Sequence, residues 1–284
     1  MLRVKRSLVL MAIVAALTMA LSFGAAASSI TLGYVEWDCA ISNTHIVAAI
    51  LEEHFDMDVE LVSVEAGIMW TGLAQGDLDA ILTAWLPVTH GFYLDEYGED
   101  IVDLGPNFEG AGIGLVVPTY VEIDSIEDLV DHAAEFNNLI YGIDPGAGIM
   151  AATDEALDVY DLPMTVLDSS DAAMTIQLGQ AYADQEWIVV TGWVPHWKFD
   201  VYDLKFLDDP ENIYGGEESI HTFVRMGFAD DFEADVLSFF DNYYLSQEQL
   251  HEMMNIVRED DASELELARQ WISDNDDAVQ QWLQ

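Results

Sequence analysis

The sequence predicts an α/β fold with two lobes, each built on a parallel-rich sheet with flanking helices, and a ligand cleft between them. Short apolar runs alternate with segments of helical periodicity, which is the pattern of parallel strands joined by helices. The alternation occurs in two sets of about 100 residues each, and a helical tail follows from about residue 230. A chain of 284 residues is long enough to bury two cores of this size.

The first set of elements starts near residue 30. Its predicted strands are ITLGYVE (30–36), VELVSV (59–64), LDAILTAW (78–85) and IGLVVP (113–118). The segment 42–55 has the periodicity of a helix, and Ser42 or Asn43 is its expected cap. A short helix over 67–76 is expected to end at Gly76. These elements make up most of the first predicted lobe.

The second set supplies the other lobe. Its predicted strands are LIYGID (139–144), TVLD (165–168) and EWIVVTGW (186–193), and its predicted helices are 125–136, 145–160 and 171–184. Ser125 is the expected cap of the first of these helices. We expect the chain to cross between the lobes near residue 117 and again within 221–228. The predicted first lobe therefore comprises 28–116 plus 225–284, and the second lobe comprises 117–224.

The charge of the chain is extreme. There are 53 acidic residues and 8 basic ones, for a formal net charge of -45. Such a surface repels nucleic acid and anionic lipid, so neither is an expected partner. Disorder is the plain alternative, but a hydrophobic content of 51% and eight tryptophans favour a packed fold. We interpret the acidity as an adaptation to salt, because at about 1 M salt the Debye length falls to roughly 3 Å.

The first 27 residues have the composition of an export signal. Arg3, Lys5 and Arg6 form a basic start, an apolar stretch follows over 8–23, and small residues offer a cleavage site near Ala27. An uncleaved membrane anchor is the alternative, but the apolar run is short for a span. The single cysteine allows no internal disulfide and does not stand at the signal boundary, where a lipidated cysteine would. We therefore expect an exported, periplasmic protein.

Three tryptophans stand where predicted strands end. Trp37, Trp85 and Trp193 each follow an apolar run and precede a segment that turns the chain. Ligands of open parallel sheets bind beyond the carboxyl ends of the strands, so these side chains are expected to face the cleft. Core packing is the alternative for any single tryptophan, and we assign Trp70, Trp187, Trp271 and Trp282 to it. Three indole faces around one space are suited to a quaternary ammonium, which has no N–H to donate.

A glycine turn within GIDPGAGIMAA (142–152) is the second pattern. After the predicted strand, the backbone amides of Gly148 and Ile149 are expected to point out of a helix N-terminus, which is a site for an anion. A plain helix start with glycine punctuation is one alternative. A dinucleotide fingerprint is the other, since 146–151 fits G-x-G-x-x-G/A and Asp168 lies about 20 residues on. That alternative implies an NAD-dependent enzyme.

His90 lies five residues after Trp85 and can reach the same cleft. As a hydrogen-bond donor it suits a carboxylate, and with Cys39 it could form a thiol–imidazole nucleophile, which is the second enzyme alternative. The histidines show no metal-ligand spacing, so no metal is expected. A cation cage next to an anion site describes a zwitterion. His196, in the similar stretch TGWVPHW (191–197), receives no ligand role, and Trp197 is ambiguous between core packing and a place in the cleft.

Several motifs resemble a known family. They are GYVEWD, GIMWTGLAQGDLDA, AWLPVTH, GLVVP, GIDPGAGIM, TGWVPHW and FLDDPENIYG, which resemble the glycine betaine/proline betaine substrate-binding proteins of ABC importers, the OpuAC-type branch. The resemblance implies a type II periplasmic-binding-protein fold that closes on its ligand. It also implies a cage of Trp37, Trp85 and Trp193, with the ligand carboxylate held by Gly148, Ile149 and His90. One departure is W-D-C-A at 37–40, where the family more often has W-D-S-E.

The expectation is an exported solute-binding protein that captures glycine betaine or proline betaine and delivers it to a membrane permease. No catalysis and no cofactor are expected, and the protein is expected to be a monomer. Choline or another quaternary amine is the alternative ligand, because it fits the cage and lacks only the carboxylate. The NAD-dependent or cysteine-based enzyme is the more distant alternative.

Overall fold

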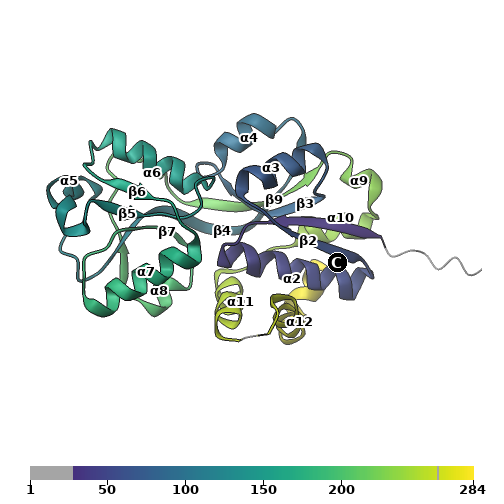
Figure 1. The fold of residues 1–284 in the computed structure, drawn as a ribbon. Helices are drawn as coiled ribbons and strands as arrows, with labels where there is room; N and C mark the ends of the chain where they lie inside the picture. The colour runs from purple at the N-terminus through teal and green to yellow at the C-terminus, as the bar shows by residue number, and fades with distance from the viewer. Residues whose placement is uncertain (1–27, 261) are drawn as a thin grey trace, which may run out of the picture.

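Two α/β lobes lie side by side in the computed structural model, with extended strands running between them (Figure 1). The structure describes residues 28–284 except residue 261, and the predicted export signal, 1–27, lies outside the described residues. The first lobe holds the N-terminal strands and the C-terminal helices, and the second holds the middle of the chain. The predicted α/β class with two lobes is confirmed.

The sheet of the first lobe is mixed. It contains β2 (Asp58–Ser63), β1 (Ser29–Tyr34), β3 (Ala80–Leu86) and β9 (Glu218–Arg225), in that spatial order. Strand β1 pairs in parallel with β2 and β3, whereas β9 runs antiparallel to β3. Every residue of β3 is buried, as its continuous apolar run predicts for a central strand covered on both faces.

Helices cover both faces of this sheet. They are α2 (Asp38–Phe55), α3 (Ala66–Gln75), α4 (Gly91–Tyr97), α9 (Phe228–Asp231), α10 (Ala234–Asn242), α11 (Gln247–Glu259), α12 (Glu264–Asp274) and α13 (Asp276–Trp282). Helices α3 and α4 lie on one side, and α2 lies on the other with α11 and α12 packed against it (Figure 1). Gly76 ends α3 in the left-handed region with φ 79°, as predicted. No helix among the described residues is both long and apolar enough to span a bilayer.

Helix α2 begins four residues earlier than its predicted cap. Trp37 is the N-cap residue, and the prediction of Ser42 or Asn43 as the cap is wrong. Asn43 is instead buried inside the helix, where its Nδ2 donates to the carbonyl of Leu82 at 3.0 Å. Its Oδ1 accepts from the hydroxyl of Tyr243 at 2.7 Å. Asn43, which the sequence suggested as a cap, therefore links the end of α10 to strand β3 through these two hydrogen bonds.

Strand β4 (Ile101–Pro118) belongs to both lobes. Ala111 pairs with Glu218 of β9, and the next residue, Gly112, pairs with Val194 of the second lobe. The change of partner precedes the predicted limit at 116 by a few residues. Since β9 already pairs in the first lobe from Glu218 onward, the return crossing also precedes the predicted 224. The lobe limits as a whole stay a prediction.

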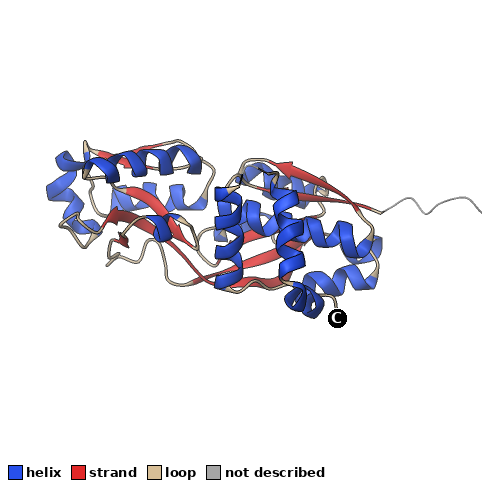
Figure 2. Cartoon of the chain, turned by 90° about the horizontal axis from the view of Figure 1, so that it is seen from below, coloured by secondary structure: helices blue, strands red, loops and turns tan. Residues whose placement is uncertain are grey.

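The second lobe repeats the layered arrangement. Its strands are β5 (Leu139–Tyr141), β6 (Thr165–Leu167), β7 (Val190–Val194) and β8 (Leu204–Phe206), and its main helices are α6 (Gly148–Val159), α7 (Asp171–Asp184) and α8 (Lys198–Val201). Seen from below, helices flank the strands in both lobes (Figure 2). The predicted helix over 125–136 is split into α5 (Leu129–His132) and two 3₁₀ turns, Ile126–Asp128 and Ala133–Phe136, although Ser125 caps it as expected.

Candidate ligand-binding site

Trp85 stands near the end of β3, where the chain turns toward α4. The peptide bond between Leu86 and Pro87 is cis, and His90 lies back beside Trp85. The backbone N–H of Trp85 donates to Nδ1 of His90 at 3.0 Å. The N–H of His90 donates to the carbonyl of Trp85 at 2.9 Å. These two hydrogen bonds close the corner and hold Trp85 at the mouth of the cleft.

A carboxylate from β9 holds the outer part of the same corner. Glu218 is buried and accepts hydrogen bonds from the backbone N–H of Val88 at 2.8 Å and of Thr89 at 2.9 Å. It also accepts from the hydroxyl of Thr89. Three donors on one carboxylate make a rigid support. The sequence reasoning missed Glu218, because 129 residues separate it from Thr89 and no local pattern links the two.

His90 is fully buried, and its environment makes it neutral. Burial lowers its pKa to about 3, and the nearby backbone of Thr83 offsets only part of this effect. Because Nδ1 accepts from Trp85, the proton of the neutral ring is on Nε2. Nε2 has no hydrogen-bond partner of normal geometry among the described residues. The ring stacks on Trp37 at a centroid distance of 6.0 Å and does not line the cavity, so its role as a ligand donor stays a prediction.

Trp37 is placed by the start of α2. Its backbone is extended with φ -107° and ψ 137°, and the helix begins at the next residue. Its Nε1 donates to Oδ2 of Asp144 in the second lobe at 3.2 Å. A second hydrogen bond also crosses the cleft, from the hydroxyl of Tyr93 to the carbonyl of Gly146 at 3.0 Å. The two lobes are therefore closed onto one another at the glycine turn.

Trp193 comes from β7 of the second lobe, where it pairs with Ile113 of β4. Its ring lies 6.3 Å from that of Trp37, centroid to centroid, with 52° between the planes. The ammonium of Lys198 lies 3.9 Å from the centroid of the Trp193 ring. Lys198 does not line the cavity, so this contact is made outside it.

A cavity lies between the lobes. It is lined by Trp37, Trp85, Thr89, Ile113, Ile143, Ala147, Gly148, Ile149 and Trp193. The structure thus brings together the three tryptophans and both residues of the glycine turn that the sequence singled out. Thr89, Ile113, Ile143 and Ala147 were missed, since each is an ordinary residue whose position is set by its neighbours in the sheets.

Gly148 and Ile149 are the first two residues of α6. Their backbone amides have no acceptor among the described residues, which leaves two donors at the positive end of a helix of 12 residues. Gly148 is required by space, because a Cβ at this position would lie 1.7 Å from the carbonyl oxygen of Thr89. The glycine therefore allows the two lobes to approach at the cavity wall.

A family model describes the same region of the chain. The substrate-binding domain of ABC-type glycine betaine transport systems, OpuAC, matches residues 28–274. The chain belongs to this family. It is therefore a substrate-binding protein of the extracytoplasmic class, and the family resemblance inferred from the motifs is confirmed.

Two proteins of known sequence are similar to parts of this chain. The glycine betaine/carnitine transport binding protein GbuC of Listeria monocytogenes is 43% identical over 178 residues, 62% of this chain. The chain spans 57% of the length of that relative. An uncharacterized protein, ORF1, of Chromohalobacter salexigens is 32% identical over 131 residues, 44% of this chain and 83% of that protein.

Two solved structures share the fold of this chain. The glycine betaine, L-proline ABC transporter binding protein ProX of Borrelia burgdorferi has a TM-score of 0.88 and 36% identity, covering 90% of this chain and 97% of that one. Lactococcal OpuAC, in a closed conformation with glycine betaine, has a TM-score of 0.85 and 35% identity, covering 90% and 100%. The type II periplasmic-binding-protein fold is confirmed by these similarities.

Membership of the OpuAC family removes the enzyme alternatives. The family is one of transport binding proteins, so the absence of catalysis that the sequence led us to expect is confirmed. The residues agree with this assignment. Burial raises the pKa of the Cys39 thiol to about 12, which leaves it without thiolate character. The glycine turn at 146–151 packs against Thr89 instead of facing an open sheet edge where a dinucleotide would lie.

Proposed function

We propose that this chain captures a betaine-type zwitterion, glycine betaine or proline betaine, and delivers it to the permease of an ABC importer. The observation that carries the proposal is the cavity walled by Trp37 and Trp85 from one lobe and by Trp193 from the other. A quaternary ammonium cannot donate a hydrogen bond, so indole faces are the means of holding it. Each such contact is worth about 0.5–2 kcal/mol.

The same cavity offers an anion site at its other end. The free amides of Gly148 and Ile149 stand at the positive end of α6 and suit a carboxylate. The unpartnered Nε2–H of His90, next to Trp37, is the third donor we assign to that carboxylate. A betaine has no net charge, so the strongly acidic surface of the protein neither attracts nor repels it at long range.

Two relatives support this ligand class. The Listeria relative is a glycine betaine/carnitine transport binding protein, and the lactococcal structure of 35% identity holds glycine betaine. The cage is complete only in the closed form, because Trp37 and Trp85 come from one lobe and Trp193 from the other. A ligand that contacts both lobes stabilises the closed form by its differential affinity.

Titration of the intrinsic tryptophan fluorescence tests the ligand. We expect glycine betaine and proline betaine to bind at least about tenfold more tightly than choline, since choline lacks the carboxylate to which the amides would donate. Tighter binding of choline would remove the anion site from the proposal. Binding of none of the three would overturn the proposed function.

We further propose that residues 1–27 are an export signal and that the mature chain acts as a periplasmic monomer beside its permease. The basic start, the apolar stretch and the small residues before Ser28 support the signal. N-terminal sequencing of the protein recovered from an osmotic shock fraction is expected to begin near Ser28. A start at Met1 would contradict cleavage.

We also propose that the acidic surface is an adaptation to salt. A formal net charge of -45 is strongly self-repelling unless counterions screen it. The midpoint of thermal unfolding is therefore expected to rise between 0.05 M and 2 M NaCl. Equal midpoints in the two buffers would contradict this interpretation.

A further inference from the structure

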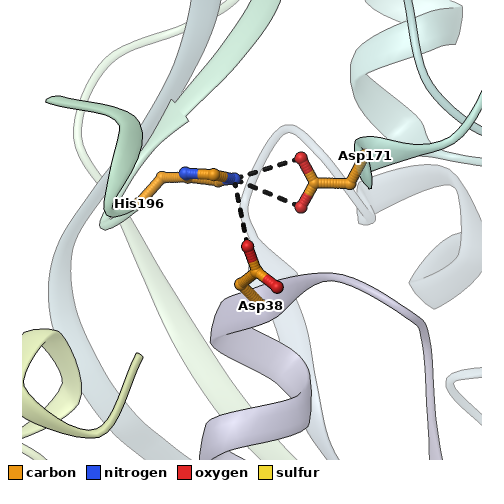
Figure 3. A group of neighbouring side chains, drawn as sticks. All are labelled: Asp38, Asp171 and His196. Carbon is orange, nitrogen blue, oxygen red and sulfur yellow. Dashed lines mark hydrogen bonds and ion pairs between the residues drawn. The ribbon is translucent and has the colours of Figure 1, made fainter. Parts of the chain in front are cut away.

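A group of charged and polar side chains lies behind Trp193, outside the ligand cavity. It consists of Asp38, Asp171, His196, Trp197 and Lys198, and we call it the rear cluster. Figure 3 shows its centre, in which Asp38 of α2 points toward the ring nitrogen of His196, and Asp171 of α7 faces the same nitrogen. The proposed function uses none of these residues.

His196 links the part of the cluster that belongs to the second lobe. Its Nδ1 accepts from the backbone N–H of Lys198 at 3.1 Å, so the proton of the neutral ring is on Nε2. That Nε2 donates to the carboxylate of Asp171, whose oxygens lie at 3.1 and 3.2 Å. Both His196 and Asp171 are buried, so this pair is a fixed part of the second lobe.

Asp38 reaches the pair from the first lobe. Its Oδ2 accepts a hydrogen bond from the Nε1 of Trp197 and lies 3.9 Å from Nε2 of His196. Asp38 directly follows Trp37, and Trp197 is four residues after Trp193. The bond between Asp38 and Trp197 therefore joins the two chain segments that carry opposing walls of the cage.

A metal ion is the rival explanation of the rear cluster. One oxygen or nitrogen from each of Asp38, Asp171 and His196 lies within 4.8 Å of the others, which is a spacing that a divalent cation could bridge. Lys198, however, is buried beside them, and the charges of Asp171 and Asp38 act on its ammonium. The ammonium of Lys198 is thus a cation already present in the cluster, and the Nε2 proton of His196 occupies the position where a metal would bind.

We propose that Asp38 is a positioning residue for the ligand cage: through Trp197 and His196 it locks the lobes behind the cage and fixes Trp37 against Trp193. The proposal rests on the function proposed above. The hydrogen bond between Trp197 and Asp38 joins the two lobes and involves no ligand atom. It therefore stabilises the closed state whichever betaine is bound. Its loss is expected to speed the release of ligand, because the open state, in which ligand enters, does not contain it.

The acidity of Asp38 gives the lock a pH dependence. Burial and then the charge of Asp171 raise its pKa above the ordinary 3.8, while His196, Trp197 and Lys198 oppose the rise. Arg258 of α11 lies over the Trp197 ring, 5.4 Å from its centroid. The closed form thus holds the proton of Asp38 more tightly than the open form. Its contribution to closure is complete below the ordinary pKa and falls as the pH rises through the raised pKa.

Stopped-flow binding of glycine betaine to four variants tests the lock. In Asp38→Ala and in Trp197→Phe we expect the dissociation rate to rise about tenfold, as for loss of one buried hydrogen bond, with little change in the association rate. The double variant is expected to lose no more than the larger single loss, because both changes remove the same bond. Asp95→Ala, at an exposed carboxylate of α4 in the same lobe, is the matched control and is expected to bind as the wild type does.

Two further readouts separate the possible outcomes. The affinity of the wild type is expected to fall as the pH rises from about 4, and that of Asp38→Asn to stay level. Independent, additive losses in the double variant, or losses confined to association, overturn the lock. Weaker binding in EDTA that Zn²⁺ restores also overturns it, in favour of a metal site. If no betaine binds the wild type, the proposed function fails. If glycine betaine binds and Asp38→Ala releases it at the wild-type rate, the lock alone is rejected.

Discussion

The two corners WLPVTH (85–90) and WVPHW (193–197) share one local design and serve two different purposes. In each, a tryptophan near the end of a strand lines the cavity, a cis proline follows two residues later, and a fully buried histidine accepts a backbone N–H at Nδ1. The proton of each neutral ring is therefore on Nε2. The corners differ in what that Nε2 meets.

Nε2 of His90 meets no partner of normal geometry within 28–260 and 262–284, and burial lowers the pKa of the ring to about 3. His196 meets the carboxylates of Asp171 and Asp38 within a charged cluster. Burial and the charge of Lys198 lower its pKa, and the two carboxylates oppose them. The Nε2 donor of the first corner therefore has no partner of normal geometry among the described residues, and the second corner uses its donor to hold the structure together. Chemical role is set by the neighbours of the motif, not by the motif.

Gly148→Ala is expected to have the largest effect, and to act through the first corner alone. The added methyl group would meet the carbonyl of Thr89 at 1.7 Å, so the lobes could not close at the cavity wall. We expect the affinity for glycine betaine to fall by about hundredfold, since overpacking against backbone costs about 1–3 kcal/mol. Calorimetric titration measures it, and an unchanged thermal midpoint without ligand is the control for folding. Wild-type affinity would show that the approach of the lobes is not required.

Trp85→Ala and Trp193→Ala compare the two corners as cage walls. Each variant loses one indole face, and we expect each to weaken betaine binding at least about tenfold. Trp187→Ala, in a part of the second lobe away from the cavity, is the control. An unchanged dissociation constant for either cavity variant would remove that tryptophan from the cage and end the equivalence of the corners.

Replacing the two histidines separates their roles. His90→Leu removes the proposed donor to the carboxylate, so we expect betaine binding to weaken about tenfold more than choline binding. His196→Leu breaks the pair with Asp171 and is expected to weaken both ligands equally. The readout is the ratio of the two dissociation constants, which general loosening does not change. A changed ratio in His196→Leu, or an unchanged one in His90→Leu, would reverse the distinction.

Lys198→Met is expected to have the smallest effect on ligand binding and to act on the pH dependence of stability. Burial lowers the pKa of Lys198 from 10.5 to about 8. Between these values the unfolded chain binds a proton that the folded chain does not, so the free energy of unfolding of the wild type rises with pH relative to the variant. The full difference is about 3 kcal/mol. Urea unfolding from pH 7 to 10.5 measures it, and parallel curves would mean that Lys198 does not titrate there.

Much of the fold could be predicted because the hydrophobic pattern and the capping residues of a strand or helix lie within the segment itself. The buried run of β3, the glycine that ends α3 and the Ser125 cap are properties of short segments. The cap of α2 was predicted wrongly because Asn43 has the chemistry of a cap and is used for burial contacts instead. The double membership of β4 was missed because pairing partners lie far away in sequence.

Some residues of the candidate site could likewise be named from the sequence, and others could not. Trp37, Trp85, Trp193, Gly148 and Ile149 could be named from the sequence, because each stands at the end of a strand or the start of a helix, where such folds place their ligands. Glu218, which supports Thr89, could not be named, and neither could the contact of Asp38 with Trp197. These contacts join residues that only the packing of the sheets and the closure of the lobes bring together.

The sequence by itself determined the class of fold, the tryptophans and the glycine turn, since hydrophobic period and residue type are properties of a local segment. Only the tertiary structure decided which histidine keeps a free donor and which is bound by carboxylates. That decision depends on burial and on charges from other elements. Asp171 lies 25 residues from His196, and Trp197 lies 159 residues from Asp38. A motif of six residues contains no information about neighbours at that distance.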